Sequence, residues 1–273
     1  MIEEKKLIMD NLEDIVFKSL FKLDKEYNIL SIILEKLYGV TITEFEELDI
    51  ETYNPTFIAK GKNKKGEVCD YLIKVEDKII SIECNKSKGA LLLKRNKSHL
   101  RRLVSESIGG SIQINFDNYD IRKENKEIYH YKVIREDNTK DNLYDGFFEI
   151  FHINLSYFKN KSYNKEKETS FEKLCRILIT RDKEELKKLT KGDERLMKIE
   201  KLVNEINGEE DLLLKYTKHE IEMMDYEIKL EEEKKKLEEK NAEIVKNMLK
   251  DNIPIETISK YTNLTKEEIE KLK

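Results

Sequence analysis

The chain has 273 residues, of which 38% are hydrophobic and 40% charged, and its formal net charge is -4. With nine Gly and two Pro, it is neither collagen-like nor of the Pro/Gly-rich disordered class, and its apolar content suffices to bury a core. No run approaches the roughly 18 apolar residues of a membrane span, and the acidic start lacks the features of a signal peptide, so we expect a cytoplasmic protein with no membrane partner.

The first elements in chain order are two predicted helices. Apolar residues recur at helical spacing over 7–21 and again over 28–37, and the second run stops before Gly39, a residue that commonly ends helices. From about residue 42 the pattern changes to short runs of β-branched and apolar residues, which are typical of strands.

These runs predict strands over 53–60, 68–75, 79–84, 111–116, 129–134 and 147–155. A helix is predicted over 91–108, between the third and fourth strands, and Gly109 and Gly110 close it. This order predicts an α/β fold with a mixed β-sheet flanked by helices.

From Phe171 onward the pattern is helical to the end of the chain. We predict three parts: an α/β domain over 1–160, a helical extension over 161–250 that includes an exposed charged helix, and a short helical tail over 251–273. The tail reads as a packing αα-hairpin or, as the alternative, a helix-turn-helix DNA reader. The charged stretch lacks sustained apolar heptads, so an oligomer is not indicated.

Charge is unevenly distributed along the chain. Residues 60–102 contain thirteen Lys and Arg against five Asp and Glu, whereas 205–243 contain seven against fourteen. The positive excess of the first stretch indicates a surface that attracts phosphate groups.

The stretch 66–86, GEVCDYLIKVEDKIISIECNK, predicts an antiparallel hairpin with a two-residue loop at 76–77. In that register Val75 faces Lys78, and Asp70 lies directly opposite Glu83. Two opposed carboxylates repel each other across a strand pair unless something compensates. A hard divalent cation such as Mg²⁺ or Mn²⁺ is the natural compensation, and metal-assisted attack of water on a phosphodiester is the chemistry suggested.

Two alternatives compete with a metal site. The carboxylates could be incidental on a solvated hairpin face, and a loop of different length would slip the register and separate them. The four His are scattered and predict no His-based metal or nucleophile site.

The motifs around this hairpin resemble those of the PD-(D/E)XK nuclease superfamily, and most closely the recombination-promoting nuclease and putative transposase family. That family opens with an Asp-x-x-Phe-Lys-x-x-Phe helix, matched here by DIVFKSLF at 14–21. A strand-borne Asp and an Ile-Glu-x-Gln strand follow, matched by Asp70 and by Ile82, Glu83 and Asn85.

The resemblance implies a restriction-endonuclease-like core and a Mg²⁺-dependent DNA endonuclease that uses water as nucleophile. It implies that Asp70 and Glu83 bind the metal, while Asn85 occupies the catalytic position that is commonly Lys or Gln. Asp14 is either an outer carboxylate of the site or half of an i, i+4 pair with Lys18. The departure at Asn85 favours the alternative function, a catalytically lapsed nuclease fold that binds DNA or a protein.

The predicted helix after the hairpin is strongly basic. We expect it to contact the DNA backbone, with a solvated helix face as the alternative. Its candidate residues are Lys94, Arg95, Lys97, His99, Arg101 and Arg102.

Overall fold

The structure is a computed structural model of the whole chain. It describes residues 7–39, 46–47, 70–75, 77–86, 94, 96–97, 109–133, 147–160, 167–262 and 264–272. The predicted strand over 53–60 and most of the predicted helix over 91–108 lie outside these ranges. The chain divides into two compact units, residues 1–213 and 214–273.

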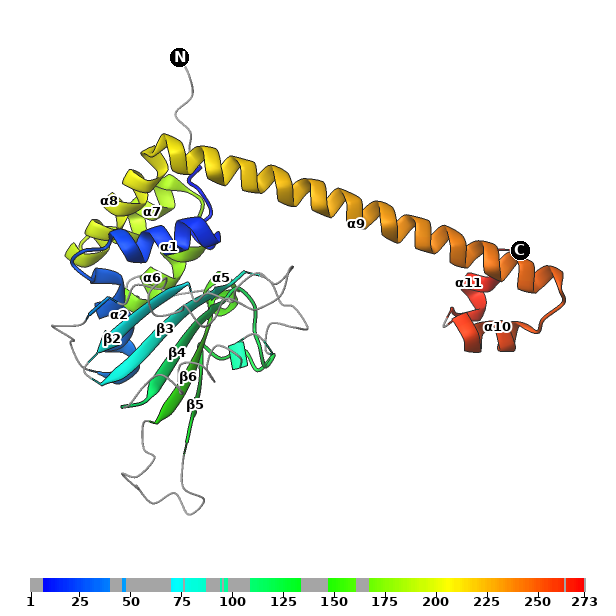
Figure 1. Ribbon diagram of the computed structural model, residues 1–273, viewed down its shortest axis with the longest axis horizontal. Helices are drawn as coiled ribbons and strands as arrows, with labels where there is room; N and C mark the ends of the chain where they lie inside the picture. The colour runs from blue at the N-terminus through cyan, green and yellow to red at the C-terminus, as the bar shows by residue number, and fades with distance from the viewer. Residues whose placement is uncertain are drawn as a thin grey trace, which may run out of the picture. The chain divides into compact units, whose positions relative to one another are not determined.

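The first unit is built on a mixed six-stranded sheet with the order β1-β2-β3-β4-β6-β5 (Figure 1). Strands β3, β4 and β6 run parallel to one another, and β2 and β5 pair antiparallel to β3 and β6. This arrangement confirms the predicted α/β class. The strands are β1 (Glu46–Glu47), β2 (Tyr71–Val75), β3 (Lys78–Asn85), β4 (Ser111–Asp117), β5 (Ile128–Lys132) and β6 (Phe148–Asn154).

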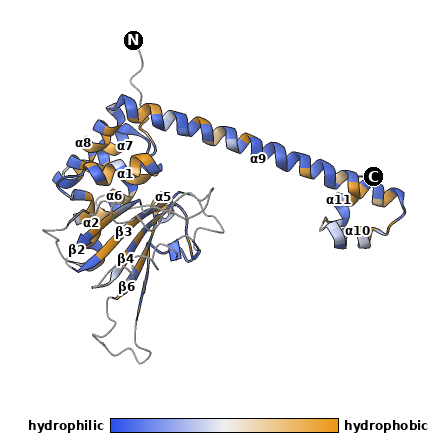
Figure 2. Cartoon of the chain, viewed as in Figure 1, coloured by the Kyte–Doolittle hydropathy of each residue, from blue (hydrophilic) through white to orange (hydrophobic). Residues whose placement is uncertain are grey.

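One face of the sheet is largely apolar because alternate residues along β2, β3 and β4 are mostly large hydrophobes, Ile73, Ile80 and Ile114 among them. Helix α1 (Asp14–Leu23) covers this face. The Phe17 ring meets that of Phe116 edge to face, with centroids 6.0 Å apart. The orange bands of the strands in Figure 2 mark this apolar content.

Helix α1 begins seven residues later than we predicted from the apolar spacing over 7–21. The residues before it are not helical: Leu7 forms an isolated bridge with Asp182, and the Ile8 amide donates to the Arg181 carbonyl at 2.9 Å. A turn at residues 11–12 then leads into the helix. The buried apolar side chains of this segment therefore pack on the rest of the unit without a helix.

Helices α2 and α5 to α8 group with α1 on one side of the sheet (Figure 1). Helix α2 (Asn28–Tyr38) ends as predicted at Gly39, whose φ of 68° is left-handed and suits glycine. Helices α6 and α8 both contact α2, so residue 160 lies inside this first unit. The others are α5 (Leu155–Asn160), α6 (Ser170–Ile179), α7 (Lys183–Thr190) and α8 (Glu194–Gly208).

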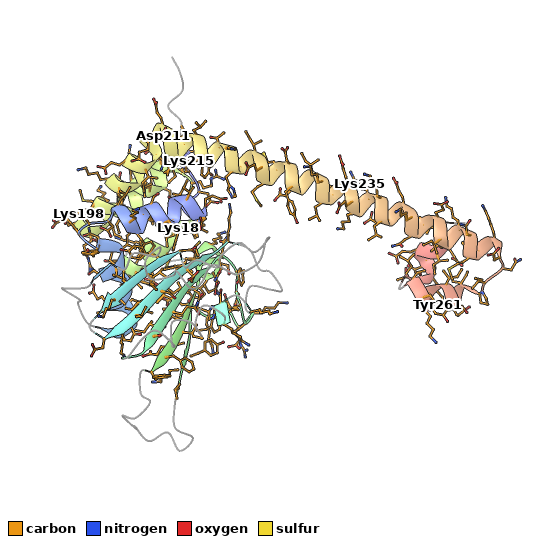
Figure 3. The ribbon with its side chains drawn as sticks, viewed as in Figure 1. Lys18, Lys198, Asp211, Lys215, Lys235 and Tyr261 are labelled. Carbon is orange, nitrogen blue, oxygen red and sulfur yellow. The ribbon has the colours of Figure 1, made fainter. Side chains whose placement is uncertain are left out.

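Helix α9 (Glu210–Lys250) passes from the first unit into the second, and its residues 221–241 are all exposed. Figure 3 shows their side chains, Lys235 among them, extending from the helix. Its last turns pack with α10 (Ile255–Thr262) and α11 (Lys266–Glu270) around Val245, Ile258 and Ile269. Within the ranges described above, no helix combines the length and apolar character that crossing a bilayer requires.

Candidate active site

The β2–β3 hairpin has the register that the sequence predicts. Tyr71 pairs with Ile82 and Val75 with Lys78, which places Asp70, one residue before β2, opposite Glu83. The Cys84 amide donates a hydrogen bond to Oδ2 of Asp70 at 2.7 Å. The Asp70 carboxylate is thus fixed against β3 beside Glu83.

The hairpin face that carries these carboxylates is buried, so the alternative of a solvated face is wrong. The exposed fraction is 0% for Ser81, 1% for Glu83 and 2% for Asn85, and the side chain of Asp70 is 12% exposed. Burial disfavours the ionised form of a carboxylate, and two neighbouring ionised carboxylates also repel each other.

Protonation relieves part of that cost. Burial, followed by the charge of Glu83, raises the pKa of Asp70 to about 7, while the Cys84 amide and Lys18 act in the opposite direction. Raised carboxyl pKa values from burial and a like charge are typical of sites built to hold a cation or to transfer protons.

Helix α1 brings a lysine to the pair. Lys18 Nζ lies 2.7 Å from the Asp14 carboxylate and 3.6 Å from Oδ1 of Asp70 (Lys18 is labelled in Figure 3). Burial lowers the pKa of Lys18, but its bonds and charge interactions with these two carboxylates raise it above its ordinary value. We did not single out Lys18 as a site residue, although its place in the Phe-Lys-x-x-Phe motif is the signal that could have done so.

Of the two interpretations of Asp14, the contacts favour the i, i+4 pair with Lys18. Its side chain is 66% exposed, in contrast to that of Asp70. Lys86, adjacent to Asn85 in the chain, points to the opposite sheet face as strand alternation predicts. There it pairs with Asp10 at 2.9 Å and with Glu13.

Two further polar side chains, Asp117 and His152, are connected to Asn85 by hydrogen bonds. Its Nδ2 donates to Oδ1 of Asp117 at 2.7 Å, and Oδ2 of Asp117 lies 2.7 Å from Nδ1 of His152. Sequence reasoning missed both residues. The signal for Asp117 was the strict alternation in SIQINFD at 111–117, where polar residues occupy every odd position of a strand.

The predicted basic helix is described at three positions. Residues 94, 96 and 97 are helical there, and Lys94 and Lys97 are exposed. Arg95, His99, Arg101 and Arg102 lie outside the residues that the structure describes.

Among the described residues, no group of three or more His, Cys, Asp and Glu side chains is arranged to hold a metal ion. Asp70 and Glu83 nevertheless fit Mg²⁺ or Mn²⁺, which accept one or two carboxylates and complete their coordination with water and phosphate oxygens. Burial and the charge of Glu83 raise the pKa of Asp70 in spite of Lys18 nearby, and a divalent cation would offset both effects.

A family model described as PD-(D/E)XK nuclease family transposase matches residues 11–233, which include every hairpin residue discussed above. Neither the curated proteins nor the solved structures contain a match to the chain.

Proposed function

Because the chain belongs to the PD-(D/E)XK nuclease family transposases, we propose that it is a metal-dependent endonuclease that hydrolyses phosphodiester bonds in DNA. The observation that carries the proposal is the buried pairing of Asp70 with Glu83 within the matched region. Two buried carboxylates destabilise the folded protein when both are ionised, and a bound cation would offset their repulsion.

The two carboxylates would hold Mg²⁺ or Mn²⁺. When bound, the ion lowers the pKa of a coordinated water and offsets the charge that develops on the phosphate. Water is then the nucleophile, and hydrolysis proceeds without a covalent enzyme intermediate.

Lys18 and Asn85 complete the proposed site. Lys18 balances the charge of Asp70 from α1 and supplies the positive charge that a lysine at position 85 would have provided. Asn85 is neutral, so it contributes by hydrogen bonding.

DNA would be bound through its backbone by the basic residues that follow the hairpin. Lys94 and Lys97 are exposed on that segment, and Arg95, Arg101 and Arg102 belong to the same basic stretch of the sequence. Phosphate contacts of this kind release counterions, so binding should weaken steeply with salt.

A second candidate function is DNA or protein binding by a nuclease fold that has lost turnover. Asn85 favours it, because an amide cannot take the charged role of lysine. Gain of cutting by Asn85→Lys or Asn85→Gln in a parent that cuts nothing would support this alternative.

Plasmid nicking with Mg²⁺ or Mn²⁺ tests the first proposal. The parent protein should cut, while Asp70→Asn and Glu83→Gln, which keep side-chain size, should not. Asp225→Asn removes an exposed carboxylate on α9 and is the matched control, which should cut like the parent. No cutting by the parent, with DNA retained in a gel shift, would instead support the binding function.

A further inference from the structure

Asn85, Asp117 and His152 form a hydrogen-bonded chain across three neighbouring strands. Asn85 of β3 is aligned with Asp117 of β4, and His152 lies on β6, the next strand of the sheet. Both hydrogen bonds measure 2.7 Å, and the three residues are 2%, 1% and 6% exposed. Asn85, the first residue of this hydrogen-bonded series, is the third residue of the proposed site after Asp70 and Glu83.

The chemistry of the partners determines which end of each side chain is used. A carboxylate only accepts hydrogen bonds, so Asn85 must present its Nδ2 to Asp117 and His152 must present a protonated Nδ1. The Oδ1 atom of Asn85 therefore lies at the end of the amide away from Asp117. Both oxygens of Asp117 are satisfied, which offsets the cost of burying its charge.

Strand alternation puts Asn85 on the same sheet face as Glu83, two residues earlier, about 7 Å along the strand. An amide that turned freely could offer this face either a nitrogen donor or an oxygen acceptor. The bond to Asp117 selects the oxygen, and oxygen is the ligand type that Mg²⁺ and Mn²⁺ prefer.

We propose that Asp117, supported by His152, is a positioning residue that holds the Asn85 amide with its Oδ1 directed to the site formed by Asp70 and Glu83. The inference rests on the proposed function for the use of that oxygen, but the orientation itself is a property of the metal-free protein. It gives Asn85 an oxygen-presenting role distinct from that of a lysine.

The variant Asp117→Asn gives a sharp test because it preserves size. As long as His152 keeps its proton on Nδ1, the new amide offers its oxygen to His152 and its nitrogen to position 85. Asn85 has to turn and accept with its Oδ1, which directs its nitrogen to the site. The double change Asn85→Asp with Asp117→Asn restores every bond and again presents an oxygen at position 85.

Two readouts follow from this design. In nuclear magnetic resonance spectra of the metal-free protein, the Asn85 side-chain amide signals should move in Asp117→Asn. By calorimetry, that variant should lose about tenfold or more in Mn²⁺ affinity, and the double variant should recover most of the loss. Gln113→Met changes another fully buried polar residue of β4 and is the matched control, which should move neither readout.

The outcomes separate this inference from the proposed function. Unchanged Asn85 amide signals in Asp117→Asn, with the His152 proton still on Nδ1 in nitrogen-15 spectra, would overturn the positioning role. Equal losses of Mn²⁺ affinity in Asp117→Asn and the double variant would also overturn it. If the parent binds no Mn²⁺, the proposed function fails, and the amide signals still decide the orientation. If Asp117→Asn does not fold, the folded double variant must keep the parent's Mn²⁺ affinity, and loss of that affinity would overturn the inference.

Discussion

Removing the negative charge of Asp70 should stabilise the metal-free protein at neutral and alkaline pH. The pKa of Asp70 rises from an ordinary value of 3.8 to about 7 in the folded chain. A difference of roughly three pKa units lowers the free energy of unfolding by about 4 kcal/mol when Asp70 is ionised. Part of this cost is the repulsion between the charges of Asp70 and Glu83.

The sign follows from the direction of the shift. Below about pH 4 Asp70 is protonated in both states and costs nothing. As the pH rises towards 7, the unfolded chain releases this proton and the folded chain keeps it, so stability falls. Above about pH 7 both states are ionised, and the full cost remains.

Asp70→Asn keeps an acceptor for the Cys84 amide but loses the charge that faces Lys18. The pKa of about 7 already includes the opposing effect of Lys18, so loss of this ion pair needs no separate subtraction. We therefore expect the variant to be more stable than the parent by about 4 kcal/mol at most near pH 8 in excess chelator, and nearly equal to it near pH 4.

Urea unfolding, followed by near-ultraviolet circular dichroism because the chain has no Trp, measures this difference. Excess Mg²⁺ should stabilise the parent near pH 8 and leave Asp70→Asn unchanged. Asp225→Asn should show neither effect. A stability difference between parent and variant that is the same at both pH values would refute the reasoning.

Three further changes test other parts of the structure. Lys18→Met should lower turnover by about tenfold or more with little change in DNA affinity, because Lys18 is proposed to offset charge in the transition state. Nicking rates measure turnover and gel shifts measure DNA affinity. Unchanged turnover would count against this role of Lys18. Phe17→Ala empties a position that is 0% exposed and should cost about 3 to 5 kcal/mol in urea unfolding, whereas a cost below about 1 kcal/mol would contradict the packing of α1 on the sheet. Gly109→Ala places a Cβ 2.4 Å from the Asp77 Cβ, so thermal unfolding should occur at a lower temperature than in the parent, and an unchanged midpoint would show that the hairpin turn does not approach Gly109.

Local patterns in the sequence were enough to identify much of the fold and the acid pair. Period-two alternation and a single turn-like point determined the register that sets Asp70 against Glu83, because a slip of one residue would move every side chain to the wrong face. The stop at Gly39 followed from the left-handed backbone that glycine adopts without strain.

The predicted start of the first helix was wrong because apolar spacing shows that residues are buried but not in which conformation. Residues 8 and 12 are buried as the spacing indicates. Their backbone is held by a distant segment at Arg181 and Asp182, which local periodicity does not report.

Only the tertiary structure decided the surroundings of the acid pair. Lys18 reaches Asp70 from a helix 52 positions away in the chain, and Asp117 and His152 reach Asn85 from separate strands. Local sequence patterns specify secondary structure and which face a side chain occupies, since these depend on neighbouring residues. Burial, the raised pKa of Asp70 and the orientation of the Asn85 amide depend on contacts between distant segments, and those form only when the sheet and its helices pack together.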